Sequence, residues 1–129
     1  MYLHAALITL LNMVLIGVAM YFVGRARGIH RVSPPTVVGH PDFERAFRAH
    51  QNTLEQTVMF LPTLWVATVF GNPTYAWWLG YAWLIGRAWY QFGYLRAAEK
   101  RSSGFMVSAI AWIGLFVVAL AGLVPKLLA

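Results

Sequence analysis

The stretch from Leu3 to Gly24 carries no Asp, Glu, Lys or Arg and is almost entirely apolar. A helix needs about 20 apolar residues to cross the hydrocarbon core of a bilayer, and this stretch is long enough. The composition of the whole chain also indicates a lipid environment, because only 11% of its residues are charged, whereas a soluble domain carries about 25%. The stretch has no basic segment before it and is too long for the apolar region of a signal peptide. We therefore interpret it as a first membrane span that stays in the protein.

Turn-forming residues divide the rest of the chain into further helices. Pro34-Pro35 interrupts regular structure after the first span, and Gly71-Asn72-Pro73 is typical of a tight turn. Asp42 is placed to cap a second helix, and Ser102-Ser103-Gly104 marks the start of a fourth. The sequence thus predicts one all-α integral membrane domain over residues 1–129. Its four transmembrane helices are expected at about 3–24, 42–70, 75–97 and 104–124.

Among the connections between the predicted helices, the first and third carry basic residues and the second carries none. They are Arg25, Arg27 and Arg31 in the first, and Lys100 and Arg101 in the third. Basic loops of membrane proteins face the cytoplasm, and in a four-span protein these two loops share a side. We expect loops 25–41 and 98–103 in the cytoplasm and both termini on the opposite side. The net charge of +6 then reflects topology and not binding of nucleic acid.

Two polar stripes interrupt the apolar pattern of the middle helices. Each shares one face of its helix: Arg48, Asn52 and Glu55 on the second, and Arg87, Tyr90 and Tyr94 on the third. An Arg or Asp at mid-membrane costs about 2.5–3.5 kcal/mol, so these faces should not meet lipid. The expected orientation puts both stripes at one depth near the cytoplasmic surface. They predict a pocket for a ligand that carries carboxylates and an ammonium group.

Simpler explanations exist for the same residues. Arg48 and Glu55 are also typical of polar contacts between helices, and tyrosines near an interface are typical of an aromatic belt. Asn12 suggests a hydrogen bond between helices and Pro62 a kink. The histidines His4, His30 and His40 show no metal-ligand spacing, so we expect no metal site. The chain has no cysteine, which excludes a cysteine nucleophile of its own.

Four segments carry a resemblance to a known family. They are 31–35 (RVSPP), 43–55 (FERAFRAHQNTLE), 63–67 (TLWVA) and 87–94 (RAWYQFGY). Together they combine the pattern E-R-x-x-R-x-x-x-N-x-x-E with R-x-x-Y-x-x-x-Y, and the combination is more specific than either part. The chain resembles the MAPEG family, the membrane-associated proteins of eicosanoid and glutathione metabolism. The similarity covers nearly the whole chain.

The resemblance implies a homotrimer of four-helix protomers that binds glutathione between neighbouring subunits. Arg101 matches the arginine that lies against the glutathione sulfur in a leukotriene-forming member. Gly28 and Gln56 stand where that member has an arginine and a tyrosine, which argues against leukotriene chemistry. The resemblance implies nine glutathione-binding positions, of which Arg27 and His50 reach in from the neighbouring subunit. The nine are Arg27, Arg48, His50, Asn52, Glu55, Gln56, Arg87, Tyr90 and Tyr94.

By this resemblance the protein is a detoxifying glutathione transferase or peroxidase, with glutathione as co-substrate. A free thiol has a pKa near 8.5, and lowering it by about two units would need about 2.7 kcal/mol, which one arginine in a partly dry site supplies. The second substrate would be a lipophilic electrophile or lipid hydroperoxide that arrives through the membrane lipid. The lack of an endoplasmic-reticulum retrieval signal favours a bacterial inner membrane.

Two other functions stay open at this point. A non-enzymatic lipid- or glutathione-binding protein of the same family is the main alternative, although it would tolerate loss of the glutathione residues that this chain carries. A small four-helix multidrug exporter is the other, but such exporters resemble one another in having an acidic residue in the first span, and this span has none.

Overall fold

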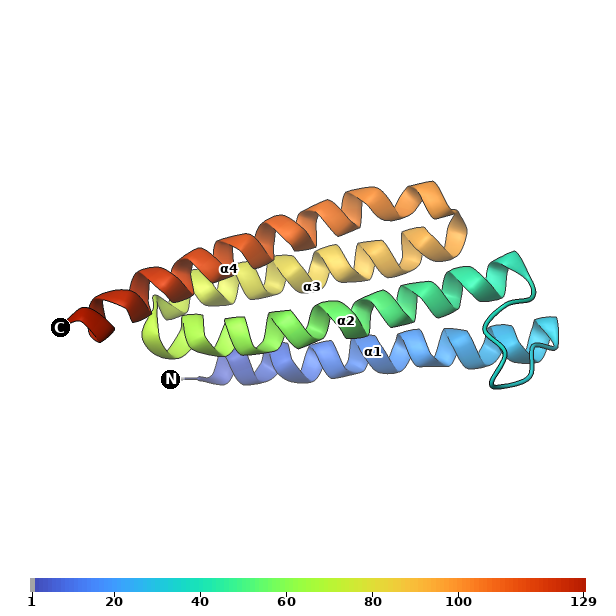
Figure 1. The fold of residues 1–129 in the computed structure, drawn as a ribbon, viewed down its shortest axis with the longest axis horizontal. Helices are drawn as coiled ribbons and strands as arrows, with labels where there is room; N and C mark the ends of the chain where they lie inside the picture. Colours follow the sequence, from blue (N-terminus) through green and yellow to red (C-terminus); the bar gives the residue numbers. More distant parts are fainter. Residues whose placement is uncertain (1) are drawn as a thin grey trace.

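The computed structural model describes residues 2–129 and is all-α. Four long helices run side by side as one elongated bundle (Figure 1). They are α1 (Leu3–His30), α2 (Pro41–Phe70), α3 (Pro73–Arg96) and α4 (Ser102–Leu128), with a short 3₁₀ turn, η1 (Ala98–Arg101), before α4. The loop 31–40 and η1 lie at one end of the bundle, and the α2–α3 turn lies at the other with the start of α1 and the end of α4 (Figure 1). The expected four-helix architecture is confirmed.

The helices extend further than the sequence predicts. The first was expected to end at Gly24 but continues to His30, where Arg31 closes it in the left-handed conformation with φ of 56°. Its last turn carries Arg27, whose positive charge is favourable at a helix C-terminus. The fourth was expected to stop before Pro125 but continues to Leu128, because a proline so near the end removes only one backbone hydrogen bond of the final turns.

The predicted cap of α2 was wrong by two residues. His40 is the N-cap, and its Nδ1 accepts a hydrogen bond of 3.1 Å from the backbone N–H of Asp42. Pro41 takes the first helical position, which suits a residue without an N–H. Asp42 therefore lies in the first turn, where its negative charge complements the helix dipole.

Close backbone contact joins α3 to α4 near η1. A Cβ atom on Gly104 would lie 2.2 Å from the backbone nitrogen of Tyr90, and one on Gly86 would lie 2.6 Å from the backbone nitrogen of Ser108. Only glycine permits such an approach, and small residues serve this purpose in many membrane helices. The contact sets the start of α4 directly against the last turns of α3.

The interior between α1, α2 and α3 is mostly apolar, with polar links between the helices. The rings of Phe60 and Trp83 stack with their centroids 3.7 Å apart and form the centre of the core. Asn12, fully buried in α1, donates to the hydroxyl of Thr57 in α2 across 3.2 Å. The expected hydrogen bond between helices at Asn12 is confirmed.

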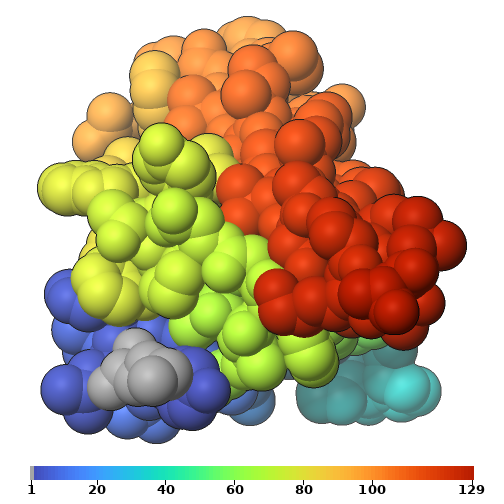
Figure 2. Space-filling view, turned by 90° about the vertical axis from the view of Figure 1, so that its left-hand side faces the viewer, coloured from blue at the N-terminus to red at the C-terminus, as the bar shows by residue number. Residues whose placement is uncertain are grey.

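Two segments of the described chain are long and apolar enough to cross a membrane. They are Leu3–His30 and Ala98–Leu128, so α1 and α4 meet this test and the more polar α2 and α3 do not. Seen from the end of the bundle in Figure 2, the α2–α3 turn lies between α1 in blue and α4 in red. The two apolar helices thus flank the two helices that carry the polar stripes.

Candidate functional site

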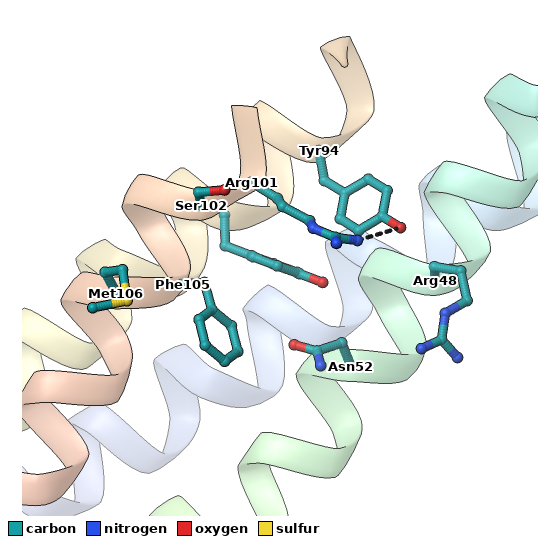
Figure 3. A pocket seen from close by; sticks show the side chains of 8 residues that line it. Arg48, Asn52, Tyr94, Arg101, Ser102, Phe105 and Met106 are labelled. Atoms are coloured by element: carbon teal, nitrogen blue, oxygen red, sulfur yellow. Dashed lines mark hydrogen bonds between the residues drawn. The ribbon is translucent and has the colours of Figure 1, made fainter. Parts of the chain in front are cut away.

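A cavity of about 410 Å³ opens between α2, α3 and the start of α4, towards the loop end of the bundle. Its size lies within the range of about 300–1,000 Å³ that is usual for small-molecule sites. In Figure 3, Arg48 and Asn52 extend from α2, while Ser102, Phe105 and Met106 belong to the wall formed by α4. The lining residues are Arg48, Asn52, Tyr90, Tyr94, Arg101, Ser102, Phe105 and Met106.

Arg101 and Tyr94 form the polar contact drawn in Figure 3. The Nη1 of Arg101 donates to the phenol oxygen of Tyr94 across 3.2 Å, and its guanidinium carbon lies 5.2 Å from the centroid of that ring. Tyr94 is buried and its ring meets that of Tyr90 edge to face at 5.6 Å. The exposed arginine is therefore held at the cavity by a rigid aromatic pair.

Arg87 lies beneath this cavity and is fully buried. Its Nη2 donates to the side-chain oxygens of Asn52, at 2.9 Å, and Thr53, at 2.8 Å. Its guanidinium carbon also lies 4.0 Å from the ring centroid of Tyr90. A guanidinium only donates hydrogen bonds, so the bond fixes the amide of Asn52 with its oxygen towards Arg87. The NH₂ group of Asn52 is then left to donate to a ligand in the cavity.

The structure brings together half of the predicted site residues. Arg48, Asn52, Tyr90, Tyr94 and Arg101 line the cavity, and Arg87 supports it from below. The others lie outside its lining. Those are Arg27, His50, Glu55 and Gln56.

Two of the residues outside the cavity have clear surroundings. Arg27 donates through Nη1 to the backbone oxygens of Val32, at 3.2 Å, and Thr36, at 2.8 Å, so it closes the loop after α1. Glu55 is exposed on the outer face of α2. Neither residue reaches a ligand in this cavity within a single chain. Their predicted role as glutathione contacts therefore depends on a neighbouring copy.

The part of the lining that comes from α4 was not predicted from the sequence. Ser102, Phe105 and Met106 directly follow Arg101 and cover the side of the cavity opposite α2. The sequence feature that could have predicted them is their helical spacing, because residues 102, 105 and 106 lie on one face of a helix. Phe105 and Met106 make this wall apolar, and both are exposed in the single chain.

The arrangement favours an anionic ligand with an apolar neighbour. Arg48 and Arg101 supply positive charge, while Asn52 and the two phenols supply donors that are directional. Charge-assisted hydrogen bonds to such groups are about twice as strong as neutral ones. The apolar wall lies next to Arg101, so an apolar molecule has access to the same point as the anion.

Comparison with known proteins connects this cavity to a family. The family model described as "MAPEG family" matches residues 2–121 of the chain. The chain belongs to the MAPEG family. This confirms the resemblance seen in the sequence, and because the family consists of membrane proteins, the apolar helices of this MAPEG protein are those of a membrane protein.

Individual relatives are similar over different shares of the chain. An uncharacterised protein from Synechocystis is 45% identical over 95% of this chain and 89% of its own length. Leukotriene C4 synthase from Cavia porcellus is 41% identical over 95% of this chain and 82% of its own length. Microsomal glutathione S-transferase 2 from Bos taurus is 45% identical over 67% of this chain, and the match spans 59% of that enzyme.

Proposed function

We propose that this MAPEG protein is a membrane-bound glutathione transferase that binds glutathione in the cavity and activates its thiol for attack on lipophilic electrophiles. Reduction of lipid hydroperoxides begins with the same thiolate and is part of the proposal. Two named relatives support it, because both a microsomal glutathione S-transferase and a leukotriene C4 synthase are at least 41% identical to this chain. Glutathione is anionic, which suits a cavity lined by two arginines.

The observation that carries the proposal is the position of Arg101. Its guanidinium lies at the cavity, bonded to Tyr94 and beside the apolar wall of Phe105. A cation near a thiol favours the thiolate, and a thiol with a pKa near 8.5 is only about 3% ionised at pH 7. Lowering that pKa by two units raises the thiolate fraction to about three quarters, a gain of about 25-fold. Arg101 is the residue we assign to this catalytic role.

The remaining contacts to glutathione follow from the lining. Arg48 and the NH₂ group of Asn52 would bind carboxylate or peptide oxygens, and the phenols of Tyr90 and Tyr94 would complete the polar wall. The ammonium group of glutathione needs a negatively charged partner. Glu55, on the same helix as Arg48, has a carboxylate that can serve as one. Since Glu55 lies outside the cavity of one chain, the complete site is proposed to form between subunits.

We propose as the assembly the homotrimer that the resemblance implies. Glu55 is exposed on α2 about 21 Å from the start of the helix, at a rise of 1.5 Å per residue. A carboxylate at that depth is costly in lipid, and a neighbouring copy would cover it. Arg27 and His50 of that copy would then approach the cavity, as the resemblance implies.

The membrane arrangement we propose has four spans. The 30 residues of α2 extend about 45 Å, which exceeds the roughly 30 Å of hydrocarbon, so the polar start of α2 can lie in the headgroup region. The loop 31–40, with the basic residues at the end of α1, and η1 lie at the same end of the bundle, and positive residues favour the cytoplasmic side. We place the protein in a bacterial inner membrane, and the similar Synechocystis protein supports this.

The test is a calorimetric titration of the purified protein with glutathione at pH 7 in two buffers of different ionisation heat. We expect binding with a buffer-dependent heat that corresponds to proton release. Arg101→Ala should bind glutathione but release no proton, and its conjugation rate at pH 7 should fall about 25-fold. Its rate should also keep rising up to about pH 8.5, whereas the unmodified protein should level off near pH 6.5.

Lys100→Ala is the matched control. It removes a positive charge from the neighbouring residue of η1, which does not line the cavity, so proton release and turnover should stay unchanged. Binding without turnover in the unmodified protein would support the non-enzymatic alternative. Unchanged turnover in Arg101→Ala would remove the catalytic assignment, and absence of binding in a folded oligomer would overturn the glutathione proposal.

A further inference from the structure

A second cluster of polar side chains lies at the loop end of the bundle, between α1 and α2. His30 ends α1, His40 caps α2, and Asp42 lies in the first turn of α2. The two imidazole rings stack with centroids 3.8 Å apart and planes inclined by only 12°. One ligand atom from each of the three residues lies within 4.8 Å of the others. The loop 31–40 thus brings together side chains that the sequence spacing alone does not connect.

The distances in this cluster approach those of a metal site. The Nε2 of His30 and the Nδ1 of His40 lie 3.9 Å and 4.0 Å from the Oδ2 of Asp42. Tetrahedral Zn²⁺ with bonds of about 2.0–2.1 Å holds its ligand atoms about 3.4 Å apart. The two imidazole–carboxylate pairs must therefore contract by about 0.5–0.6 Å, and the imidazole–imidazole pair, which lies within 4.8 Å, by up to about 1.4 Å. The stacked rings must also turn so that both nitrogens face one point, which these partly exposed side chains permit. Three protein ligands would leave a fourth position for water.

The donor set selects the class of ion. Imidazole nitrogen suits Zn²⁺, Cu²⁺ and Ni²⁺, whereas Mg²⁺ and Ca²⁺ prefer oxygen ligands alone. With two imidazoles and one carboxylate, the cluster matches the first group. We propose that His30, His40 and Asp42 bind one divalent transition-metal ion, for which Zn²⁺ is the probe. This site is separate from the cavity, because none of the three residues lines it.

Two existing contacts compete with the ion. Arg45 makes an ion pair with the Oδ1 of Asp42, so the carboxylate is already partly neutralised. The Nδ1 of His40 accepts the backbone N–H of Asp42 as the cap of α2. Binding requires these contacts to loosen, and Arg25, which lines the same surface hollow as His30 and Asp42, adds an unfavourable charge. Removal of the competing Arg45 charge should therefore strengthen binding.

The ion would link the end of α1 to the start of α2 and close the loop between them. The same loop is held by Arg27 through the backbone oxygens of Val32 and Thr36. A ligand that binds only the folded state raises its stability in proportion to RT ln(1 + [L]/Kd). Zn²⁺ should therefore raise the melting temperature of the full chain without any glutathione present.

The experiment uses the full chain in detergent, purified without a histidine tag and stripped of metals with a chelator. Titration with Zn²⁺ alone should give one ion per chain and a raised melting temperature. His30→Gln and Asp42→Asn should each weaken binding by about tenfold or more, the loss expected for about 1.4 kcal/mol. His40→Asn should do the same while it keeps a side chain that caps helices well. Arg45→Gln should bind Zn²⁺ several-fold more tightly.

His4→Gln is the matched control, because His4 lies at the opposite end of the bundle and bonds to Tyr81. Its Zn²⁺ affinity should equal that of the unmodified protein. Equal affinity in a double variant of His30→Gln and His40→Asn would overturn the proposal, as would a folded unmodified protein that binds no Zn²⁺. Because glutathione is absent throughout, either outcome is independent of the transferase proposal.

Discussion

The substitution Asn52→Asp tests whether the amide at the floor of the cavity contacts the ligand. Asp has nearly the same volume as Asn and still offers an oxygen to Arg87, which donates to Asn52 across 2.9 Å. It differs in having no NH₂ group. The change therefore preserves the support from below, removes the donor that faces the cavity, and adds a negative charge beside an anionic ligand.

The lost donor sets the minimum of the expected loss, and repulsion between the new carboxylate and the anionic ligand adds to it. A hydrogen bond to a charged group contributes about 1.5–3 kcal/mol, and about 1.4 kcal/mol corresponds to a tenfold change in affinity. Asn52→Asp should thus weaken glutathione binding by at least about 10- to 150-fold. Folding should not suffer, because the buried guanidinium of Arg87 gains an opposite charge where it previously met a neutral amide.

The assay combines calorimetric affinity for glutathione at pH 7 with the melting temperature of the protein in detergent. Asn72→Asp is the matched control, since Asn72 caps α3 at the far end of the bundle and Asp is an equally good cap. It should leave both quantities unchanged. Unchanged affinity in Asn52→Asp would refute the contact. A loss of affinity that is accompanied by a lower melting temperature would mean that Asn52 is only structural.

Three further predictions concern the same cavity. Tyr94→Phe should leave the melting temperature unchanged but lower kcat about two- to tenfold, because Arg101 loses one acceptor worth about 0.5–1.5 kcal/mol; kinetics with an apolar electrophile measure this. Gly104→Ala should destabilise the protein by about 1–3 kcal/mol and weaken glutathione binding, since its Cβ would lie 2.2 Å from the nitrogen of Tyr90. Thermal unfolding measures the loss of stability, with Gly24→Ala as the control, because a Cβ on Gly24 would meet only open space. Glutathione should raise the melting temperature more than its diethyl ester does, because the ester lacks both carboxylates and keeps only the ammonium charge, whereas the cavity is positively charged.

Helical periodicity and loop charge were sufficient to predict one side of the cavity. The spacing of Arg48 and Asn52 puts them on one face of α2, and that of Tyr90 and Tyr94 puts them on one face of α3. The basic loops predicted that these faces lie at the same depth. The structure does bring the four side chains to one cavity.

Position along the axis is what periodicity could not resolve. Glu55 shares a face with Arg48 but lies seven residues further on, about 10 Å along the helix, and it is outside the cavity. Arg87 likewise lies seven residues before Tyr94 on the same face, and it ends up beneath the cavity. A shared face therefore predicts direction, whereas the depth at which neighbouring helices meet decides which residues line a common space.

Contacts that depend on tertiary packing were also beyond the sequence. The wall formed by Phe105 and Met106 exists because Gly104 lets α4 approach α3 at the backbone of Tyr90, and glycine has many other roles in helices. The pairing of His30 with His40 depends on the path of the loop between them. Neither feature leaves a periodic signal, so neither could be read from spacing.

The charges around the cavity link the fold to its proposed ligand. Arg87 makes no ion pair among residues 2–129, and its Nε and Nη1 atoms have no hydrogen-bond partner there. A buried charge is costly without a counter-charge, and Arg48 and Arg101 add to the positive charge nearby. No acidic residue lines the cavity to balance them. We therefore expect the anion that balances these guanidinium groups to come from outside the protomer, a role that the carboxylates and the thiolate of glutathione would fill.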